Sequence, residues 1–264
     1  MKPMSSSYVP VSREQHGHRR WRRYDDYAFA RETHIVEIAL AETAKIASAM
    51  PIVFVRTGEE MEPKALMALA PNTNAFVSPD QKWLASYVPA FVRGYPFKFI
   101  PATNGELVLC LETTRISDTD GEAFFDEGGA LAPATQAVLG FLQQLEVSRQ
   151  AARQAATDLQ RLGLLKPLSP DVALGLPPES AGVLLGVDEA ALNQVPDEAF
   201  LALRNSQALR LAFHQMLSLE QWPALLSLTQ RQRQHREALN ARAASIYSPP
   251  DDVELQIDWD RFKT

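Results

Sequence analysis

The hydrophobic pattern of the chain changes near residue 130. Before that point the apolar residues come in short β-branched runs, such as residues 51–55, which are typical of buried strands. From residue 133 to residue 162 they recur at steps of three and four, which predicts one long helix closed by Gly163. Strands followed by helices indicate an α+β fold rather than a doubly wound sheet. We therefore expect a mainly antiparallel β-sheet N-terminal half with short helices, followed by a long helix and a helical C-terminal half.

Asn104 and Gly105 give the most specific local prediction. They lie between apolar runs at 97–100 and 106–111. Asn-Gly is favoured in tight hairpin turns because both central residues need positive φ. The sequence therefore predicts an antiparallel hairpin with Cys110 buried in its second strand.

The remaining elements follow from the same patterns. We expect further strands at 34–38, 51–55, 75–77 and 183–187. We expect helices at 40–50, 64–70, 189–194, 196–204, 207–216 and 220–240, with a loop at 59–63. Asp188 is the predicted N-cap of the helix at 189–194.

Composition along the chain suggests three regions. Residues 1–20 are rich in Ser, Pro, Arg and His, so we expect a flexible leader. Residues 21–240 are expected to form a single α+β domain, β-rich over 21–130 and helical over 131–240. Residues 241–264 form an acidic C-terminal tail, and the basic start and the acidic end could attract each other.

Charge, apolar run length and cysteine content exclude several classes. The net charge is -6, whereas a protein that covers nucleic acid is usually basic, so we expect no nucleic-acid partner. No run approaches the roughly 20 apolar residues of a membrane span. Cys110 is the single cysteine and lies in an apolar run, so a buried thiol is expected. With no secretory signal pattern, we expect a cytoplasmic protein.

Motifs for metals, nucleotides and nucleophilic catalysis are missing from the sequence. The five histidines have no zinc-ligand spacing: His16, His18, His34, His214 and His235. No glycine-rich phosphate loop follows a predicted strand, and no nucleophile motif of the GxSxG or SxxK kind is present. We therefore expect no metal, no cofactor and no assigned catalytic residue.

The segment at residues 86–99 is rich in aromatics and proline, and it is the best candidate for a binding surface. Aromatic and arginine side chains are the usual anchors of such surfaces, although these aromatics could equally be core. The candidate binding residues are Asn74, Trp83, Tyr87, Arg93, Tyr95, Phe97 and Asp126. We expect Arg93 at a groove wall, either paired with a carboxylate such as Asp118, Asp126 or Glu127 or anchoring a ligand.

Several of these segments resemble the bacterial SapC family. The matching residues lie at 34–42, 49–54, 74–77, 87–97, 109–112, 124–129, 162–167 and 186–189, and include Trp83. The most specific run, at 88–97, reads VPAFVRGYPF, and the resemblance covers about residues 21–230. It implies an accessory role linked to outer-membrane receptor or surface-layer systems, and it brings no catalytic residues with it.

Three functional hypotheses remain at this point. The first is a non-catalytic binding or accessory protein that engages a peptide, a carbohydrate or a partner protein. The second is an enzyme acting on a peptide or sugar through Arg93 with Asp126 or Glu127. The third is a structural component of a surface layer. A protein or peptide partner is expected under the first, with a carbohydrate ligand and a homo-oligomer as open alternatives.

Overall fold

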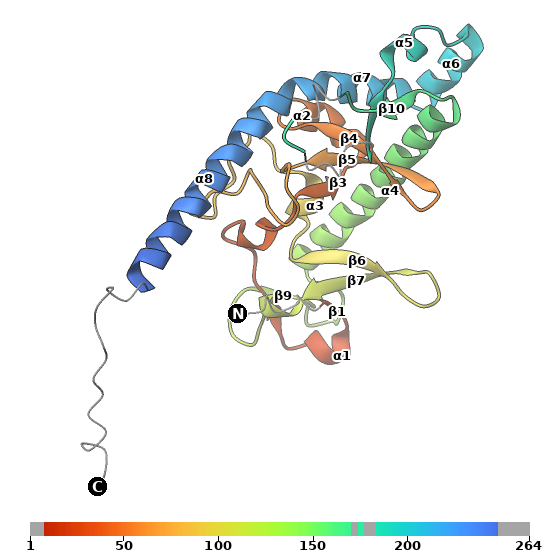
Figure 1. The fold of residues 1–264 in the computed structure, drawn as a ribbon. Coiled ribbons are helices and arrows are strands. Elements are labelled where there is room, and N and C mark those ends of the chain that lie inside the picture. The colour runs from red at the N-terminus through yellow and green to blue at the C-terminus, as the bar shows by residue number, and fades with distance from the viewer. Residues whose placement is uncertain (1–7, 170–173, 177–182, 248–264) are drawn as a thin grey trace. The chain divides into compact units, whose positions relative to one another are not determined.

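The computed structural model describes residues 8–169, 174–176 and 183–247 (Figure 1). It confirms the α+β class, because antiparallel sheets dominate the first half and a long helix and further helices follow. The chain divides after Thr229 into two compact units. The described part of the second unit is the remainder of the helix α8 (Trp222–Tyr247). Residues 1–7 of the predicted leader and 248–264 of the predicted tail lie outside the described residues.

A five-stranded antiparallel sheet has the strand order β10-β11-β4-β5-β3. Its strands are β3 (Ile35–Glu37), β4 (Ile52–Thr57), β5 (Glu60–Leu66), β10 (Leu165–Pro167) and β11 (Leu184–Val187). The central strand is β4, and its first three side chains have no exposed surface, as its apolar run predicts.

The strand β5 corrects our expectation of a loop at 59–63 and a helix at 64–70. The chain turns at Gly58, whose φ is 61°, and residues Glu60 to Ala65 pair with β4. Pro63 lies inside β5, but β3 pairs only with Lys64 to Leu66. The amide of Leu66 bonds the carbonyl of Pro51 on the β4 side, so by alternation the nitrogen of Pro63 faces the β3 side, where no strand pairs with it. Pairing with β4, and not local sequence preference, therefore makes this segment a strand.

Two three-stranded sheets, with orders β1-β7-β6 and β8-β2-β9, form the other β-layer. Their strands are β1 (Tyr8–Pro10), β2 (Arg20–Trp21), β6 (Phe97–Pro101), β7 (Leu107–Glu112), β8 (Ile116–Ser117) and β9 (Glu122–Ala123). The hairpin of β6 and β7 confirms the prediction made from Asn104 and Gly105. Only Gly105 has a positive φ, 83°, because the connection is longer than a two-residue turn.

Residues 8–20 differ from the flexible leader that their composition suggests. β1 pairs with β7, and the short helix α1 (Arg13–His16) follows with Ser12 as its N-cap. His16 is only 2% exposed and its ring lies 4.9 Å from the ring of Phe124. The pairing partners lie about a hundred residues further along the chain, so local polarity could not reveal them.

The long helix α4 (Pro133–Arg161) confirms the predicted helix and contacts both β-layers. Near its start, Leu142 packs with Trp21 and Phe97 of the small sheets. Near its end, Ala155 and Leu159 pack with residues of the large sheet and have no exposed surface. Figure 1 shows α4 in green, running from β6 to the large sheet.

Shorter helices pack around α4 and the large sheet. They are α2 (Thr43–Ala47), α5 (Glu189–Leu192), α6 (Asp197–Asn205) and α7 (Ala208–Ser218). Asp188 caps α5 as predicted, since its side chain accepts hydrogen bonds from the amides of Ala190 and Ala191. Gln215 of α7 is fully buried and bonds backbone groups of Val187 and Ile52. No helix among the described residues is both long enough and apolar enough to span a bilayer.

We predict that Cys110 reacts slowly with thiol reagents in the native protein. Its side chain is 3% exposed, and burial raises the pKa of the thiol, so little reactive thiolate is accessible. Ellman's reagent should modify it stoichiometrically only after denaturation. Fast, complete modification of the folded protein would contradict the burial in β7.

Candidate functional site

A cleft of about 690 Å³ lies among β6, α4, the short helix α3 (Ala90–Arg93) and the segment that leads into β3. The face of α4 that lines it changes along the helix. Leu142 and Leu145 come first, and Glu146, Arg149 and Arg153 follow on the next turns. Each of these positions lies three or four residues from another of them, so they share one side of the helix. The cleft therefore has an apolar end and a charged end.

The apolar end carries large hydrophobic side chains that remain open to solvent. Phe91 of α3 is 47% exposed and Leu107 of β7 is 42% exposed, and both line the cleft. Phe99 and Pro101 of β6 line it as well. A cluster of exposed apolar residues around a concavity is a usual mark of a binding site.

The cleft also contains the unpaired edge of a sheet. β6 is the terminal strand in the order β1-β7-β6. The amide of Glu112 bonds the carbonyl of Pro96 at 3.0 Å, and that of Ala102 bonds the carbonyl of Glu106 at 2.8 Å. In an antiparallel ladder such pairs alternate, so Lys98 and Ile100 face β7. The backbone N–H and C=O of Phe99 therefore point away from β7, and no described residue pairs with them.

Five charged side chains form a network of ion pairs at the other end. Arg149 contacts Glu37 of β3 and lies 2.7 Å from Glu146. Arg153 lies 3.3 Å from Glu37 and also contacts Glu62 of β5. The Nε of Arg153 is buried and has no hydrogen-bond partner among the described residues. The network fixes α4 to the edge of the large sheet and closes this end of the cleft.

Tyr95 forms one wall of the cleft and is held from two sides. Its ring stacks on that of Phe29, with centroids 3.8 Å apart and planes 7° apart. Its hydroxyl donates to Glu112 at 3.0 Å and accepts from Arg115 at 3.3 Å. Burial is the main cause that raises the pKa of Tyr95. The side chain is rigid and one of its faces is covered.

A second cluster is organised by the buried carboxylate of Glu42, which is 5% exposed. It accepts hydrogen bonds from the amide of Ala39 at 3.0 Å, the hydroxyl of Tyr87 at 2.8 Å and the amide of Ala90 at 2.7 Å. Burial, with the charge of Glu42 next, raises the pKa of Tyr87 to about 12. The cluster fixes the start of α3 and so positions Phe91.

Arg93 does not line this cleft, whereas we expect it at a groove wall, either paired with a carboxylate or anchoring a ligand. It is exposed, and it donates to the hydroxyl of Tyr87 at 3.0 Å and the carbonyl of Val88 at 3.1 Å. Its guanidinium carbon lies 5.5 Å from the ring centroids of Tyr87 and Phe141. Among the described residues, no ion pair joins Arg93 to Asp118, Asp126 or Glu127.

The other candidate residues are distributed between wall, core and loop. Tyr95 and Phe97 line the cleft, and Phe97 is 3% exposed. Trp83 is partly buried and donates to the carbonyl of Tyr87 at 2.8 Å. Asn74 is 2% exposed and bonds the carbonyl of Ala30 and the amide of Phe76. Asp126 accepts from the amide of Ala130 at 2.9 Å within its own loop.

Sequence reasoning did not identify the charged end of the cleft or the buried carboxylate of Glu42. Glu37, Arg149 and Arg153 come from elements far apart in sequence, and nothing in their local pattern marks them. Glu42 gave one signal, since it is an acid inside a run that reads as a core-facing helix. No cluster of three or more His, Cys, Asp or Glu side chains in the described residues is arranged to hold a metal ion.

Comparison with protein-family models identifies the family of this chain. The SapC family model matches residues 11–225. The chain belongs to the SapC family. The matched span contains every residue that lines the cleft except Tyr8. No curated protein and no solved structure matches the chain.

We predict that Glu42→Ala costs about 3 kcal/mol of unfolding free energy, because two amides and a hydroxyl lose their buried acceptor. Arg93→Ala, which removes an exposed neighbour of the same tyrosine, should cost less than about 1 kcal/mol. Chemical denaturation of both variants measures the difference. Equal losses would show that Glu42 does not organise this cluster.

We predict that Glu62 stabilises the fold at neutral pH and not in acid. Burial alone would raise the pKa of Glu62, but hydrogen bonds from Lys64 and Thr57, with the charges of Lys64 and Arg153, lower it below its ordinary value of 4.5. A carboxyl group with a lowered folded pKa contributes stability above its unfolded pKa and loses it as the pH falls through the folded pKa.

Glu62→Gln should therefore cost about 2 kcal/mol at pH 7, and the difference from wild type should shrink below about pH 4. The matched control is Glu60→Gln, on the same strand and 3.5 Å from the same Arg153, but 63% exposed. Urea denaturation at several pH values tests both. A difference for Glu62→Gln that stays constant down to pH 3 would contradict the linkage.

Proposed function

We propose that the chain is a non-catalytic binding protein that holds an extended peptide segment of a partner protein in the cleft, along the free edge of β6. The partner belongs, in this proposal, to an outer-membrane receptor or surface-layer system. The observation that carries the proposal is the outward-facing backbone of Phe99 at the terminal strand of its sheet, inside a cleft with exposed apolar walls.

An unpaired strand edge next to apolar pockets is the arrangement that recognises extended peptides. Main-chain hydrogen bonds to the edge give affinity, and alternate side chains of the peptide enter the pockets. Phe99 offers one N–H and one C=O, and Pro101 ends the edge because it has no N–H. The ladder is therefore short, and most of the affinity comes from apolar contact with Phe91, Leu107 and Leu145.

A peptide suits the cleft better than a sugar. Sugars bind through open aromatic faces and unpaired polar side chains, but Tyr95 is already stacked on Phe29. The arginines at the charged end are engaged by Glu37, Glu146 and Glu62. Apart from polar side chains such as Thr33 and Lys98, what remains accessible is apolar surface and backbone.

The residues that we considered for catalysis do not support an enzymatic role for the cleft. A nucleophilic thiol needs exposure and a lowered pKa, whereas Cys110 is buried and its pKa is raised. The enzyme hypothesis relied on Arg93 with Asp126 or Glu127, and Arg93 makes its contacts with Tyr87 and Val88 instead. The proposal is accordingly one of binding alone.

Site-specific photo-cross-linking of the full chain in its host cell tests the proposal. A benzophenone side chain at position 91 should capture a partner, and mass spectrometry should map the adduct to one short segment of that partner. The matched control is position 84, because Leu84 is 51% exposed and does not line the cleft. Equal capture from both positions would contradict a specific cleft.

A second variant pair tests whether the apolar wall is needed. Leu107→Asp should abolish capture from position 91 without lowering the melting temperature by more than a few degrees, because Leu107 is 42% exposed. Leu201→Asp on α6, where the residue is 52% exposed, should leave capture unchanged. Capture that survives Leu107→Asp would show that the partner binds elsewhere.

A further inference from the structure

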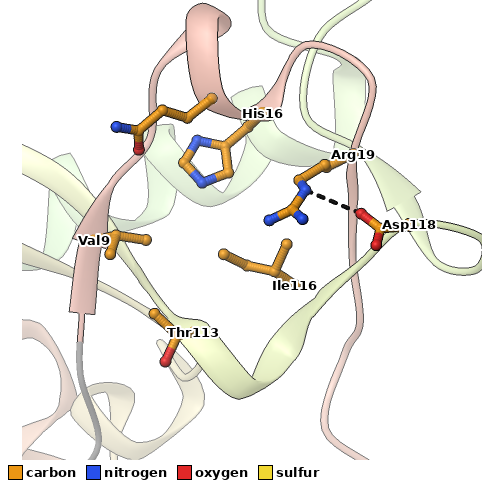
Figure 2. A pocket seen from close by; sticks show the side chains of 7 residues that line it. Val9, His16, Arg19, Thr113, Ile116 and Asp118 are labelled. Atoms are coloured by element: carbon orange, nitrogen blue, oxygen red, sulfur yellow. Dashed lines mark ion pairs between the residues drawn. The ribbon is translucent and has the colours of Figure 1, made fainter.

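A second pocket, of about 490 Å³, lies between the N-terminal segment and the chain that follows β7 (Figure 2). It is separate from the cleft, since the two share no lining residue. Val9 and Ile116 give it an apolar side, and His16 and Arg19 give it a polar one. Figure 2 shows the His16 ring and the Arg19 guanidinium facing the same hollow, with Ile116 below them and Val9 to one side. A volume of this size is within the usual range for small-molecule sites.

His16 is a fixed part of the pocket wall, because its side chain is buried and contacts the backbone of Ser12. It is 2% exposed, and its Nδ1 lies 3.2 Å from both the amide nitrogen and the carbonyl oxygen of Ser12. That carbonyl already accepts the backbone amide of His16 at 2.9 Å. The amide of Ser12 has no other acceptor among the described residues, so it donates to Nδ1. The ring proton then lies on Nε2, which has no described partner and is free to donate.

Arg19 supplies a second donor on the same side of the pocket. Its Nε is held by Asp118 at 2.9 Å, and its terminal nitrogens have no partner among the described residues. The side chains of Arg19 and Asp118 are 46% and 73% exposed, so this ion pair lies in water and is weak. The free side of the guanidinium keeps its capacity for a bidentate acceptor.

We propose that this pocket binds a carboxylate group attached to a small aliphatic body. The terminal nitrogens of Arg19 and the Nε2–H of His16 donate to the two carboxylate oxygens, and the aliphatic part lies against Val9 and Ile116. A carboxylate fits because it presents two acceptors in one plane, which matches the fork of an arginine. The carboxylate belongs either to a free small acid or to the C-terminus of a peptide.

Titration of the full chain with butyrate, followed by amide and histidine-ring NMR signals at pH 7, tests the site. The Ser12 amide and the His16 ring should shift to saturation with butyrate. The neutral isostere butyramide should bind at least about tenfold more weakly, because it brings no charge to Arg19. Equal binding of butyramide would overturn the proposal, and so would equal binding of inorganic phosphate, which has no aliphatic body.

Three variants assign the effect to the pocket. Arg19→Gln should weaken butyrate binding about tenfold or more. Asp118→Asn should strengthen it severalfold, because it removes the competing negative charge beside Arg19. Arg22→Gln is the matched control, since Arg22 is exposed and does not line the pocket, and it should change nothing beyond ionic-strength effects. An unchanged affinity in Arg19→Gln, or a loss as large in Arg22→Gln, would overturn the assignment.

A last arm distinguishes the two sources of the carboxylate. Acetyl-Ala-Val with a free C-terminus is compared with butyrate and with its own C-terminal amide. Tighter binding of the peptide acid than of butyrate assigns the site to a chain terminus, and tighter binding of butyrate assigns it to a free acid. Binding of the peptide amide as tight as that of the peptide acid would contradict carboxylate recognition.

Discussion

The packing of α4 against two separate β-layers is the interaction on which the rest of the first unit depends. Toward its end the helix presents alanines with no exposed surface, Ala152, Ala155 and Ala156, against residues of the large sheet. Side chains this small let the backbone approach closely, so that Phe54 and Met61 of the sheet are fully buried. Toward its start the helix inserts Leu142 among the aromatic rings of the small sheets. One rigid element thereby fixes the positions of both layers.

The cleft is a consequence of this arrangement. Both layers end in a strand that pairs on one side only, β3 in the large sheet and β6 in the small one, and both strands contribute to the cleft. Ion pairs from α4 close the β3 side, where Arg149 and Arg153 hold Glu37. At the β6 side, by contrast, apolar side chains and the backbone of Phe99 stay accessible. The exposed edge is kept short by Pro101, which limits unwanted pairing with other chains.

The N-terminal segment contributes to two features at once. As β1 and β2 it completes both small sheets. Its helix α1 brings His16 to the second pocket, and the segment between α1 and β2 brings Arg19. Most of this segment, and every residue lining the two cavities except Tyr8 and Val9, falls within the part of the chain that matches the SapC family. The family match therefore covers the surfaces that we assign to binding, whereas most of α8 lies beyond it.

The sequence by itself determined the elements whose signals are local. The hairpin at Asn104 and Gly105, the long helix from Pro133, the buried Cys110 and the Asp188 cap depend on turn chemistry, periodicity and side-chain capping. Tertiary structure alone decided that residues 8–20 are ordered and that Glu60–Leu66 is a strand, because cross-strand partners distant in sequence supply the hydrogen bonds. It also decided which candidate residues share a site. Tyr95 and Phe97 line the cleft, whereas Asn74 bonds Ala30 and Phe76, and Asp126 bonds Ala130 within its own loop. A cleft is formed by side chains from several elements, and the distances between those elements depend on packing that no single segment encodes.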